Sequence, residues 1–369
     1  MKIVYLYSSL AIWGGVERVL VDKMNNLVSR GYEVHMITSD QGQHPVPYKL
    51  DERVHLCDLQ IRLYSQYQFR GLRRLKESRK LTRLYFMRLK DILVKICPDL
   101  IVCTTSSDIY NLLRIKGDIP LVVEAHNNFS HIDTWWHHLL NRWNIYWIGK
   151  ADAVVTLTQG DAKNWQRVSK HVYVIPNMVH LNDTGRNSDC VNKRAIFVGR
   201  LVEQKGIPDL IKVWQIVHQR YPNWQLDVFG NGDMDSIPDI KMFVHPPTSN
   251  IMEEYVNSSV LLMTSIFEPF GLVIPEAMSC GLPVVAFDCP YGPADIITHE
   301  FNGYLVSGRD VCQYADYVCQ LIESPRLRHI LGTAGVKTAQ QYHANNIMPQ
   351  WQRLFSDLMS KVSFEKNRQ

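Results

Sequence analysis

Short apolar runs and helix-like segments alternate along the whole chain. Ile3–Tyr7 is the first run, and after a glycine turn Val16–Ser29 places Leu20, Met24 and Leu27 on one face. The runs lack the strict alternation of half-exposed strands, which favours parallel sheets covered by helices on both faces. Further strands are expected at Glu33–Ile37, Leu100–Cys103, Leu121–Val123, Ala153–Leu157, Val172–Ile175, Ala195–Val198, Gln225–Phe229, Lys241–Val244, Val260–Met263 and Val284–Phe287. Further helices are expected at Leu72–Ile96, Thr134–Gly149, Gly160–Val168, Pro208–Gln219, Asn250–Asn257 and Leu272–Ser279, and from Val311 onward.

This rhythm stops once, at Asn177–Lys193, a segment rich in Asn, Asp and Ser with almost no apolar periodicity. We therefore expect an α/β protein of two doubly wound, Rossmann-like parallel-sheet domains, residues 1–180 and 181–340, followed by a helical segment over residues 341–369. In such folds a ligand binds in the cleft that faces the carboxyl ends of the strands.

Composition narrows the class of protein. The chain has 369 residues, 46% hydrophobic and 21% charged, which excludes a disordered, collagen-like or small disulfide-stapled protein. A net charge of +4 is too small to indicate nucleic-acid binding. The eight cysteines show no C-x-x-C spacing and predict reduced, buried thiols of a cytosolic protein.

The first residues admit two interpretations. Lys2 before the apolar stretch Ile3–Trp13 is compatible with a short signal peptide, but no small-x-small cleavage site follows, which favours a first strand. No apolar run approaches the roughly 18 residues that a bilayer span requires.

The segment Glu268–Glu276 carries the strongest chemical signal. A carboxylate accepts hydrogen bonds from two hydroxyl groups at once, which suits the diols of a sugar. The N–H groups of Phe270, Gly271 and Leu272 would lie at a helix start, which is a ready anion site. Two glutamates at this spacing also occur by chance, so the specificity comes from the glycine and the prolines around them.

Two glycine-containing turns follow predicted strands. Gly199-Arg200-Leu201 follows Ala195–Val198, and Lys205-Gly206 precedes a helix, so that Arg200 and Lys205 could hold a diphosphate rather than being ordinary solvated charges. Gly14-Gly15, between the first strand and the first helix, either lets the backbone approach a ligand or forms a simple tight turn.

Three further features have either a functional or a purely structural interpretation. His126 follows the strand Leu121–Val123 at its carboxyl end and is either a ligand group or a structural histidine. Asp233-Met-Asp235 has the D-x-D form of metal-dependent sugar transferases, although a turn after Gly232 is favoured. Trp135 and Trp136 line an acceptor cleft or belong to the core.

Between Arg62 and Lys95 the chain holds eleven basic residues against two acidic ones. Its apolar side chains form an approximate helical stripe. The helix Arg70–Lys95 therefore either packs on the sheet as an ordinary surface helix or also presents a basic face to anionic lipid.

Taken in order, these residues resemble the retaining glycosyltransferases of family 4, which have the two-domain GT-B fold. The likeness spans nearly the whole chain, and its motifs are specific only as a series. The series runs through Gly14-Gly15, Glu124-Ala125-His126, Ile175-Pro176-Asn177, Gly199-Arg200-Leu201, Lys205-Gly206, Gly230-Asn231-Gly232-Asp233, Glu268–Glu276 and Asn302-Gly303 with Leu305-Val306.

The resemblance implies an acceptor-binding first domain, a donor-binding second domain and a last helix that crosses back to the first. Arg200 and Lys205 would hold the donor diphosphate as it leaves, with Gly199 in the same turn. Glu276 would take the ribose hydroxyls, and Glu268 the sugar near O3 or O4. The amides of Phe270, Gly271 and Leu272 would contact sugar and phosphate, His126 the O6 region, Gly15 the phosphates and the acceptor, and Gly14, Trp135 and Trp136 the acceptor side.

The resemblance also implies that neither a cofactor nor a metal is required, since a leaving phosphate oxygen takes the acceptor's proton. The segment Cys289–Asp295 resembles a subgroup from bacterial capsule and lipopolysaccharide assembly. That implies a UDP-hexose or UDP-N-acetylhexosamine donor and a saccharide acceptor, carried on a lipid diphosphate, at the cytoplasmic membrane face.

The chain departs from the family at two places. Asp233–Lys241 is too short for the usual helix, and His245-Pro246-Pro247 stands where the family often has glycine, which puts the choice of nucleotide in doubt. The alternatives are a nucleotide-sugar epimerase or hydrolase, a binding module without activity, and a metal-dependent transferase that uses Asp233 and Asp235.

Overall fold

The computed structural model describes residues 1–129 and 138–366 and divides the chain into two compact units. The first consists of Met1–Leu157, Asp161–Ile175 and Met348–Gln369, and the second of Thr158–Gly160 and Pro176–Ile347. These divisions differ by a few residues from those we expected at 180/181 and 340/341. The residues that follow Ile175 make their contacts with the second unit. Val179 N–H donates to the Tyr342 carbonyl at 2.9 Å, and Asn182 N–H donates to Ser279 Oγ at 3.0 Å.

The first unit is built on a seven-stranded parallel sheet in the order β3-β2-β1-β4-β5-β6-β7. The strands are β1 (Lys2–Tyr7), β2 (Glu33–Thr38), β3 (His55–Asp58), β4 (Leu100–Thr104), β5 (Leu121–Ala125), β6 (Ala153–Thr156) and β7 (Val172–Val174). The edge strand β3 was not predicted, because its four residues, His-Leu-Cys-Asp, carry little apolar signal.

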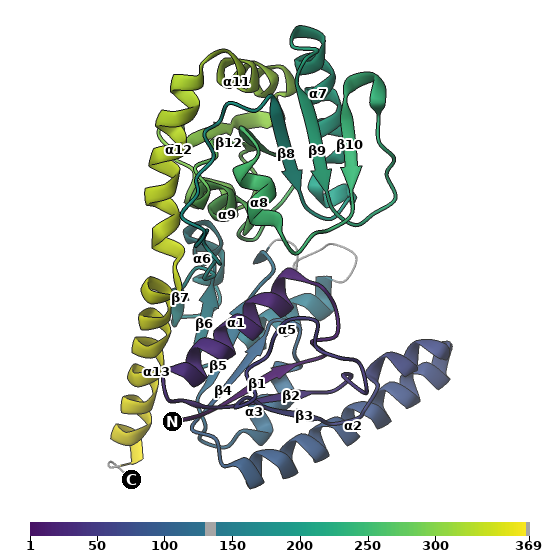
Figure 1. Ribbon diagram of the computed structural model, residues 1–369. Coiled ribbons are helices and arrows are strands. Elements are labelled where there is room, and N and C mark those ends of the chain that lie inside the picture. Colours follow the sequence, from purple (N-terminus) through teal and green to yellow (C-terminus); the bar gives the residue numbers. More distant parts are fainter. Residues whose placement is uncertain (130–137, 367–369) are drawn as a thin grey trace. The chain divides into compact units, whose positions relative to one another are not determined.

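Helices cover this sheet as the βα alternation predicts (Figure 1). They are α1 (Gly15–Ser29), α2 (Gly71–Ile96), α3 (Ile109–Ile115), α5 (His138–Ile148), α6 (Gln159–Trp165) and, from Met348, the body of α13 (Ala344–Lys366). The predicted helix Thr134–Gly149 is therefore seen from His138, and its first residues lie outside the described part of the chain. Leu89 and Leu93 of α2 pack on Val4, Leu6 and Ile37 of the sheet.

The second unit has a six-stranded parallel sheet in the order β10-β9-β8-β11-β12-β13, which is the order of the complete doubly wound Rossmann fold. Its strands are β8 (Arg194–Val198), β9 (Gln225–Phe229), β10 (Met242–His245), β11 (Val260–Met263), β12 (Val284–Phe287) and β13 (Gly303–Val306). Its helices are α7 (Ile207–Arg220), α8 (Ile251–Val256), α9 (Val273–Ser279), α10 (Gly292–Ile296), α11 (Val311–Glu323) and α12 (Pro325–Ala339). Each unit, taken by itself, confirms the predicted fold class.

Two local expectations are met in the second unit. The segment between β7 and β8 carries no helix or strand, as its composition predicts. Between Asp233 and Lys241 there is only a single 3₁₀ turn, Pro238–Ile240, as the shortness of this segment led us to expect in place of the helix that the family usually has. The core beneath this sheet is centred on Trp214, whose indole N–H donates to the Ile240 carbonyl at 2.7 Å.

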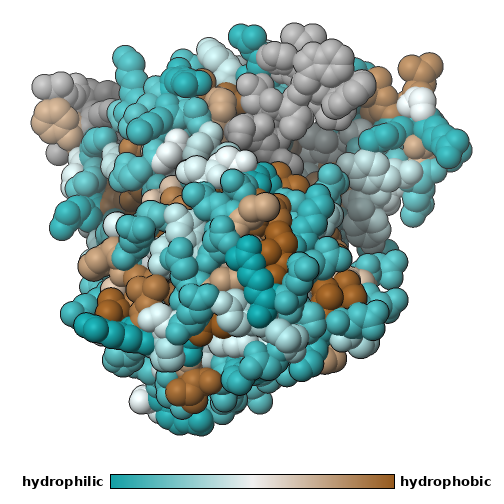
Figure 2. All heavy atoms as spheres, turned by 90° about the horizontal axis from the view of Figure 1, so that it is seen from above, coloured by the Kyte–Doolittle hydropathy of each residue, from teal (hydrophilic) through white to brown (hydrophobic). Residues whose placement is uncertain are grey.

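The face drawn in Figure 2 is mostly hydrophilic, with hydrophobic side chains in small, separate groups. Within the described residues, every helix is either too short or too polar to cross a bilayer.

Candidate active site

The carboxyl ends of β8 and β11 bring two predicted loops together. These strands pair in parallel, with Ala195 opposite Val260. Thr264 Oγ1 donates to the Lys205 carbonyl at 3.0 Å, and Ile266 N–H donates to the Gln204 carbonyl at 2.8 Å. The loop after β8 and the loop that leads to Glu268 are therefore hydrogen-bonded to each other, at the edge where a doubly wound sheet binds its ligand.

Lys205 and Glu268, both predicted from the sequence, form an ion pair. Only 14% and 12% of the two side chains is exposed, and Ser265 Oγ donates to the same carboxylate oxygen at 3.2 Å. The backbone of Glu268 is also fixed, because its N–H donates to the Pro290 carbonyl and its own carbonyl accepts from Tyr291 and Gly292. A sugar hydroxyl and a phosphate would thus meet a carboxylate and an ammonium that are already oriented.

Arg309 supports this loop and was not predicted. Its guanidinium donates to the carbonyls of Ser265 at 2.8 Å and Thr264 at 3.0 Å, and it forms an ion pair with Asp209 of α7. Gly206, with φ of +65°, is required here because a Cβ would lie 2.0 Å from the Thr264 carbonyl oxygen. The only sequence signal for Arg309 is its position directly after β13.

Arg200 and Gly199 lie on the same loop but in different settings. Arg200 is exposed, and its Nη2 lies 3.3 Å from Gln204 Oε1, so its guanidinium remains available at the end of β8. The aliphatic part of Lys205 packs beside Gly199. A Cβ placed on Gly199 would lie 3.5 Å from Lys205 Cε, which is ordinary van der Waals contact. Gly230 packs on the Gly199 carbonyl, where a Cβ would lie 1.8 Å away.

The segment Phe270–Leu272 turns the chain into α9. Gly271 has a φ of +89°, a conformation that L side chains rarely adopt. Phe270 is buried, with its ring edge-on to Tyr342 at a centroid distance of 5.4 Å. Glu276 follows one turn into α9 and is also buried, and Tyr255 Oη lies 3.4 Å from its Oε2. The predicted ribose contact of Glu276 would therefore be made by a largely enclosed carboxylate.

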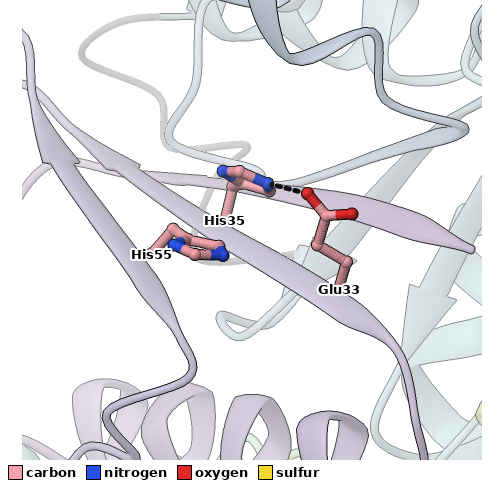
Figure 3. A group of neighbouring side chains, drawn as sticks. All are labelled: Glu33, His35 and His55. Carbon is pink, nitrogen blue, oxygen red and sulfur yellow. Dashed lines mark hydrogen bonds and ion pairs between the residues drawn. The ribbon is translucent and has the colours of Figure 1, made fainter.

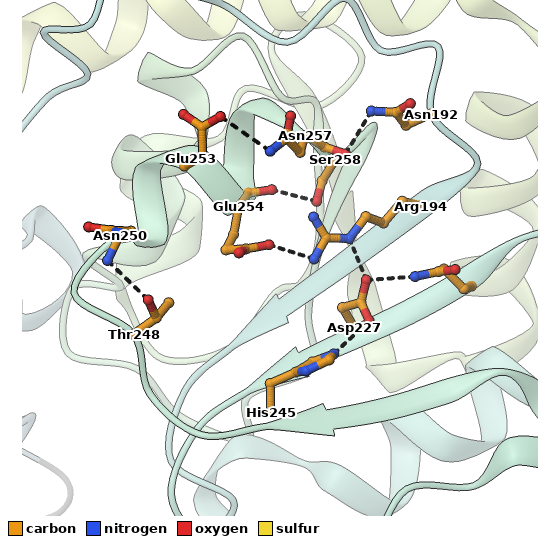
Figure 4. A network of polar contacts seen from close by, with 11 residues as sticks. Asn192, Arg194, Asp227, His245, Thr248, Asn250, Glu253, Glu254, Asn257 and Ser258 are labelled. Carbon is orange, nitrogen blue, oxygen red and sulfur yellow. Dashed lines mark hydrogen bonds and ion pairs between the residues drawn. The ribbon is translucent and has the colours of Figure 1, made fainter.

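A polar network lies on the β9 and β10 side of the same sheet (Figure 4). Buried Asp227 accepts from Arg194 Nε, and its Oδ1 lies 2.7 Å from His245 Nε2. Burial acts to raise the pKa of Asp227, but the hydrogen bonds from Arg194, Gln225 and His245 outweigh it and lower the pKa. Asp227 thereby orients the imidazole ring of His245 in His245-Pro246-Pro247, the motif by which this chain departs from the family.

The ring of His245 also stacks on Phe229, with centroids 4.7 Å apart and planes 20° apart. The stack stands at the carboxyl ends of β9 and β10, which are one and two strands away from β8, the strand that the Lys205 loop follows. Where the family often has glycine, this chain therefore places an oriented aromatic surface.

In the first unit, His126 follows β5 and belongs to a buried charged cluster. Its Nε2 lies 2.9 Å from Glu124 Oε2, and Lys23 Nζ of α1 lies 2.6 Å from the same oxygen. Lys23 also lies over the Trp351 ring of α13, 3.9 Å from its centroid. Burial acts to raise the pKa of Glu124, but Lys23 and His126 overcome it and lower the pKa to about 2. Burial has the opposite effect on Lys23, whose pKa is lowered.

Gly14 and Gly15 stand at the start of α1, the first as its N-cap residue. The Gly14 carbonyl accepts a hydrogen bond from Tyr48 Oη at 3.1 Å. A Cβ on Gly14 would lie 2.0 Å from a carboxylate oxygen of Glu17, which is itself buried and accepts from Tyr7 Oη at 2.9 Å. A side chain at Gly14 would therefore displace the carboxylate end of Glu17 from its present position.

The described structure brings some predicted residues together and separates others. Gly199, Arg200, Lys205, Glu268 and the Phe270–Glu276 segment share one end of the second sheet, whereas Gly14, Gly15 and His126 belong to the first unit. Trp135 and Trp136, predicted on the acceptor side, lie outside the described residues.

Two family models match successive parts of the chain. The model of Glycosyltransferase Family 4 matches residues 13–183, and that of Glycosyl transferases group 1 matches residues 187–338. The chain belongs to glycosyltransferase family 4. The resemblance seen in the sequence is thereby confirmed.

Relatives of this family 4 glycosyltransferase match it over nearly their full length. A glycosyltransferase of Haemophilus influenzae without an assigned activity is 27% identical over 95% of this chain and 98% of its own. An amylovoran biosynthesis glycosyltransferase of Erwinia amylovora is 26% identical over 95% of this chain and 98% of its own.

Among solved structures, the crystal structure of a TarM variant from S. aureus, in complex with fondaparinux, α-GlcNAc-glycerol and UDP, superposes with a TM-score of 0.76. It covers 96% of this chain and 99% of its own at 16% identity, and so shows that the fold is GT-B.

Proposed function

We propose that this glycosyltransferase moves a hexose or N-acetylhexosamine from a UDP-sugar to a saccharide acceptor during surface polysaccharide assembly, with retention at the anomeric carbon and without a metal. The observation that carries the proposal is the Lys205–Glu268 ion pair. The two residues lie on hydrogen-bonded loops at the carboxyl ends of β8 and β11. It joins one group suited to phosphate with one suited to sugar hydroxyls.

In this mechanism the cations act on the leaving group. Lys205 and Arg200 hold the diphosphate and stabilise the negative charge that develops on it, which is the largest contribution such a site makes to the rate. The acceptor hydroxyl attacks from the face that the diphosphate leaves, its oxygen bonds to the anomeric carbon, and its proton passes to a departing phosphate oxygen. The glycosidic bond to the phosphate breaks with both electrons remaining on that oxygen.

The remaining residues position the donor. Glu268 accepts hydrogen bonds from the sugar near O3 or O4, and Glu276 from the ribose. The amides of Phe270, Gly271 and Leu272 contact sugar and phosphate. For His126 and Gly15 we propose the roles that the resemblance implies, a contact with the sugar near O6 and a close approach of the backbone to the phosphates.

The donor and acceptor classes rest on relatives. UDP is present in the S. aureus structure that has the same fold, and one relative of similar length is named for amylovoran biosynthesis. On the basis of these names, we propose that this chain uses a UDP-sugar donor and a saccharide acceptor that is carried on a lipid diphosphate.

Helix α2 supports a location at the cytoplasmic face of a membrane. Its exposed apolar residues include Leu72 at 85% and Val94 at 67%. Between these two positions along α2, a surface cavity of about 460 Å³ is lined by Arg79, Arg83 and Lys90, with Phe86 and Met87. Basic and apolar side chains on one exposed helix suit the interface of an anionic bilayer.

The D-x-D pair lies at the surface of the second unit. Asp233 and Asp235 are both exposed, and within the described residues no third His, Cys, Asp or Glu joins them in ligand geometry. A divalent cation at such a pair takes its remaining ligands from substrate phosphates, so the comparison with and without EDTA tests this alternative.

The first experiment is a panel of UDP, GDP, ADP and their common sugars, measured by thermal shift and by donor hydrolysis, with and without EDTA. We expect UDP to raise the melting temperature, and one UDP-sugar to be hydrolysed slowly at an EDTA-insensitive rate. Lys205→Ala should abolish the shift, while Lys212→Ala, an exposed lysine on α7, should retain it.

Three outcomes would contradict the proposal. If no nucleotide shifts the melting temperature, the chain is an inactive binding module or the site is wrongly assigned. Loss of turnover in EDTA would favour a metal-dependent transferase. Rapid release of UDP with a free or epimerised sugar, even when acceptor is present, would favour a hydrolase or epimerase.

A further inference from the structure

A second group of potential ligands lies at the amino ends of β2 and β3, in the first unit (Figure 3). Glu33 and His35 are two residues apart on β2 and so share one face of the sheet. His55, the first residue of the edge strand β3, is the register partner of His35. Three side chains with metal-binding atoms therefore meet at one corner of the sheet, at the opposite end of its strands from His126.

The geometry of this corner suits chelation. His35 Nε2 lies 2.8 Å from Glu33 Oε1, and the two imidazole rings stack with centroids 4.6 Å apart. One ligand atom from each residue lies within 4.8 Å of the others, and no other group of His, Cys, Asp or Glu in the described part of the chain meets that condition. Tetrahedral zinc, with bonds of about 2.1 Å, holds its ligands roughly 3.4 Å apart, so small side-chain rotations suffice.

The neighbouring charge does not prevent a cation from binding. Lys2 Nζ lies 3.3 Å from Glu33 Oε1, but it also donates to the Ile96 carbonyl at 2.9 Å and retains that partner if Glu33 turns to a metal. The side chain of Glu33 is 47% exposed and that of His35 15%, so an ion can enter and water can complete its coordination.

We propose that Glu33, His35 and His55 form a binding site for a divalent transition metal of the zinc class. Two imidazoles and one carboxylate are ligands that Zn²⁺, Co²⁺ and Ni²⁺ share, whereas Mg²⁺ and Ca²⁺ prefer oxygen alone. The bound ion links the four-residue edge strand β3 to β2. The site is separate from the catalytic residues proposed above and does not depend on their assignment.

The test is a titration of the full chain, stripped of metal with EDTA and dialysed, with Co²⁺ alone, followed by visible absorption, and then with Zn²⁺ in competition. We expect one ion per chain at micromolar affinity, a cobalt spectrum of low coordination number, and displacement by Zn²⁺. Zinc should also raise the melting temperature, because it binds only the folded state tightly.

Variants assign the ion to this corner. His55→Gln should weaken binding at least tenfold and abolish the zinc-dependent rise in melting temperature, and Glu33→Gln should weaken binding less. His44→Gln, an exposed histidine outside the cluster, should leave both measurements unchanged. Because His55 is exposed on an edge strand, its variant should fold, which circular dichroism checks.

The inference is overturned by either of two results. One is no cobalt spectrum at a hundredfold molar excess of metal. The other is binding that His55→Gln leaves unaltered, which would place the ion elsewhere.

Discussion

At the scale of single residues, the two glutamates of the segment Glu268–Glu276, for which we propose donor binding, have different surroundings. Glu268 pairs with Lys205 and accepts from Ser265 in the loop after β11, where charge develops in the proposed reaction. Glu276 is enclosed on α9 beside Tyr255. A carboxylate near the reacting sugar should affect turnover, whereas one that holds the ribose should affect nucleotide affinity.

This difference predicts a split between two alanine variants. Glu276→Ala should raise the Kd for UDP by roughly tenfold or more, since it removes a charge-assisted hydrogen bond. Glu268→Ala should lower kcat by about 10²-fold while changing the Kd for UDP only slightly. Calorimetry with UDP and steady-state kinetics measure the two effects, with Glu203→Ala, an exposed glutamate on the Lys205 turn, as the control. Equal losses of UDP affinity in both variants would refute the division of roles.

The buried pair Lys23–Glu124 predicts a large effect on stability. Lys23→Met removes the ammonium from Glu124 in the core, leaves only His126 beside that carboxylate, and should cost about 3–5 kcal/mol of unfolding free energy. The double variant Lys23→Met/Glu124→Leu should recover much of that loss. Urea denaturation provides the measurement, and Arg53→Met, which breaks the exposed pair with Asp51, should change the midpoint little. An additive double variant would show that the two groups do not interact.

The same pair predicts a dependence on pH. The pKa of Glu124 lies at about 2 in the folded chain against an ordinary value of 4.5, so the folded state favours the ionised form. Its contribution to stability is therefore complete above pH 4.5 and is lost as the pH falls toward 2. The urea midpoint of the wild type should fall more steeply across this window than that of Glu124→Gln. Parallel curves for the two proteins would contradict the low pKa.

At the scale of elements, helix α2 shows what periodicity can and cannot predict. The spacing of its apolar residues predicts the helix, which runs over Gly71–Ile96. It does not predict which apolar residues are buried, because only Leu89 and Leu93 pack fully on the sheet while Leu72 remains 85% exposed. An amphipathic pattern has the same form whether its apolar side meets a sheet or a bilayer.

If α2 binds anionic lipid, charge reversal on it should release the chain. Arg79→Glu/Arg83→Glu should reduce binding to vesicles of phosphatidylglycerol and phosphatidylethanolamine by roughly tenfold or more, since each basic residue contributes about 1 kcal/mol at such a surface. Sedimentation with vesicles measures binding, and Arg326→Glu/Arg353→Glu is the control with the same charge change elsewhere. Equal losses in both variants would show only an effect of net charge, and no binding by the wild type would exclude the lipid surface.

At the scale of the whole molecule, the folded chain sorts its eight cysteines by access. None forms a disulfide; Cys97 and Cys312 are exposed and Cys57 is half-buried. Burial raises the pKa of Cys103, Cys280 and Cys289 to about 12, so these thiols are protonated as well as enclosed. The remaining two, Cys190 and Cys319, are also buried.

Alkylation should therefore proceed in stages. Iodoacetamide at pH 8 should modify Cys97 and Cys312 rapidly and Cys57 more slowly, and should reach the other five only after unfolding in urea. Mass spectrometry of intact and digested protein gives the count and the positions. Rapid native modification of Cys103 or Cys280 would contradict the packing of the unit that contains it.

The sequence by itself determined most of the strands and helices, though not β3 and β13, together with the parallel fold class, the family and the loops after β8 and β11. These depend on local periodicity and short motifs, which are complete within a few tens of residues. Only the tertiary structure decided that Lys205 pairs with Glu268, that Arg309 holds the Ser265 carbonyl and that Glu276 is enclosed. It also brought Lys23, Glu124 and Trp351 together from three distant segments. Side chains far apart in sequence meet only through the packing of the sheet and its helices, and no local pattern carries that information.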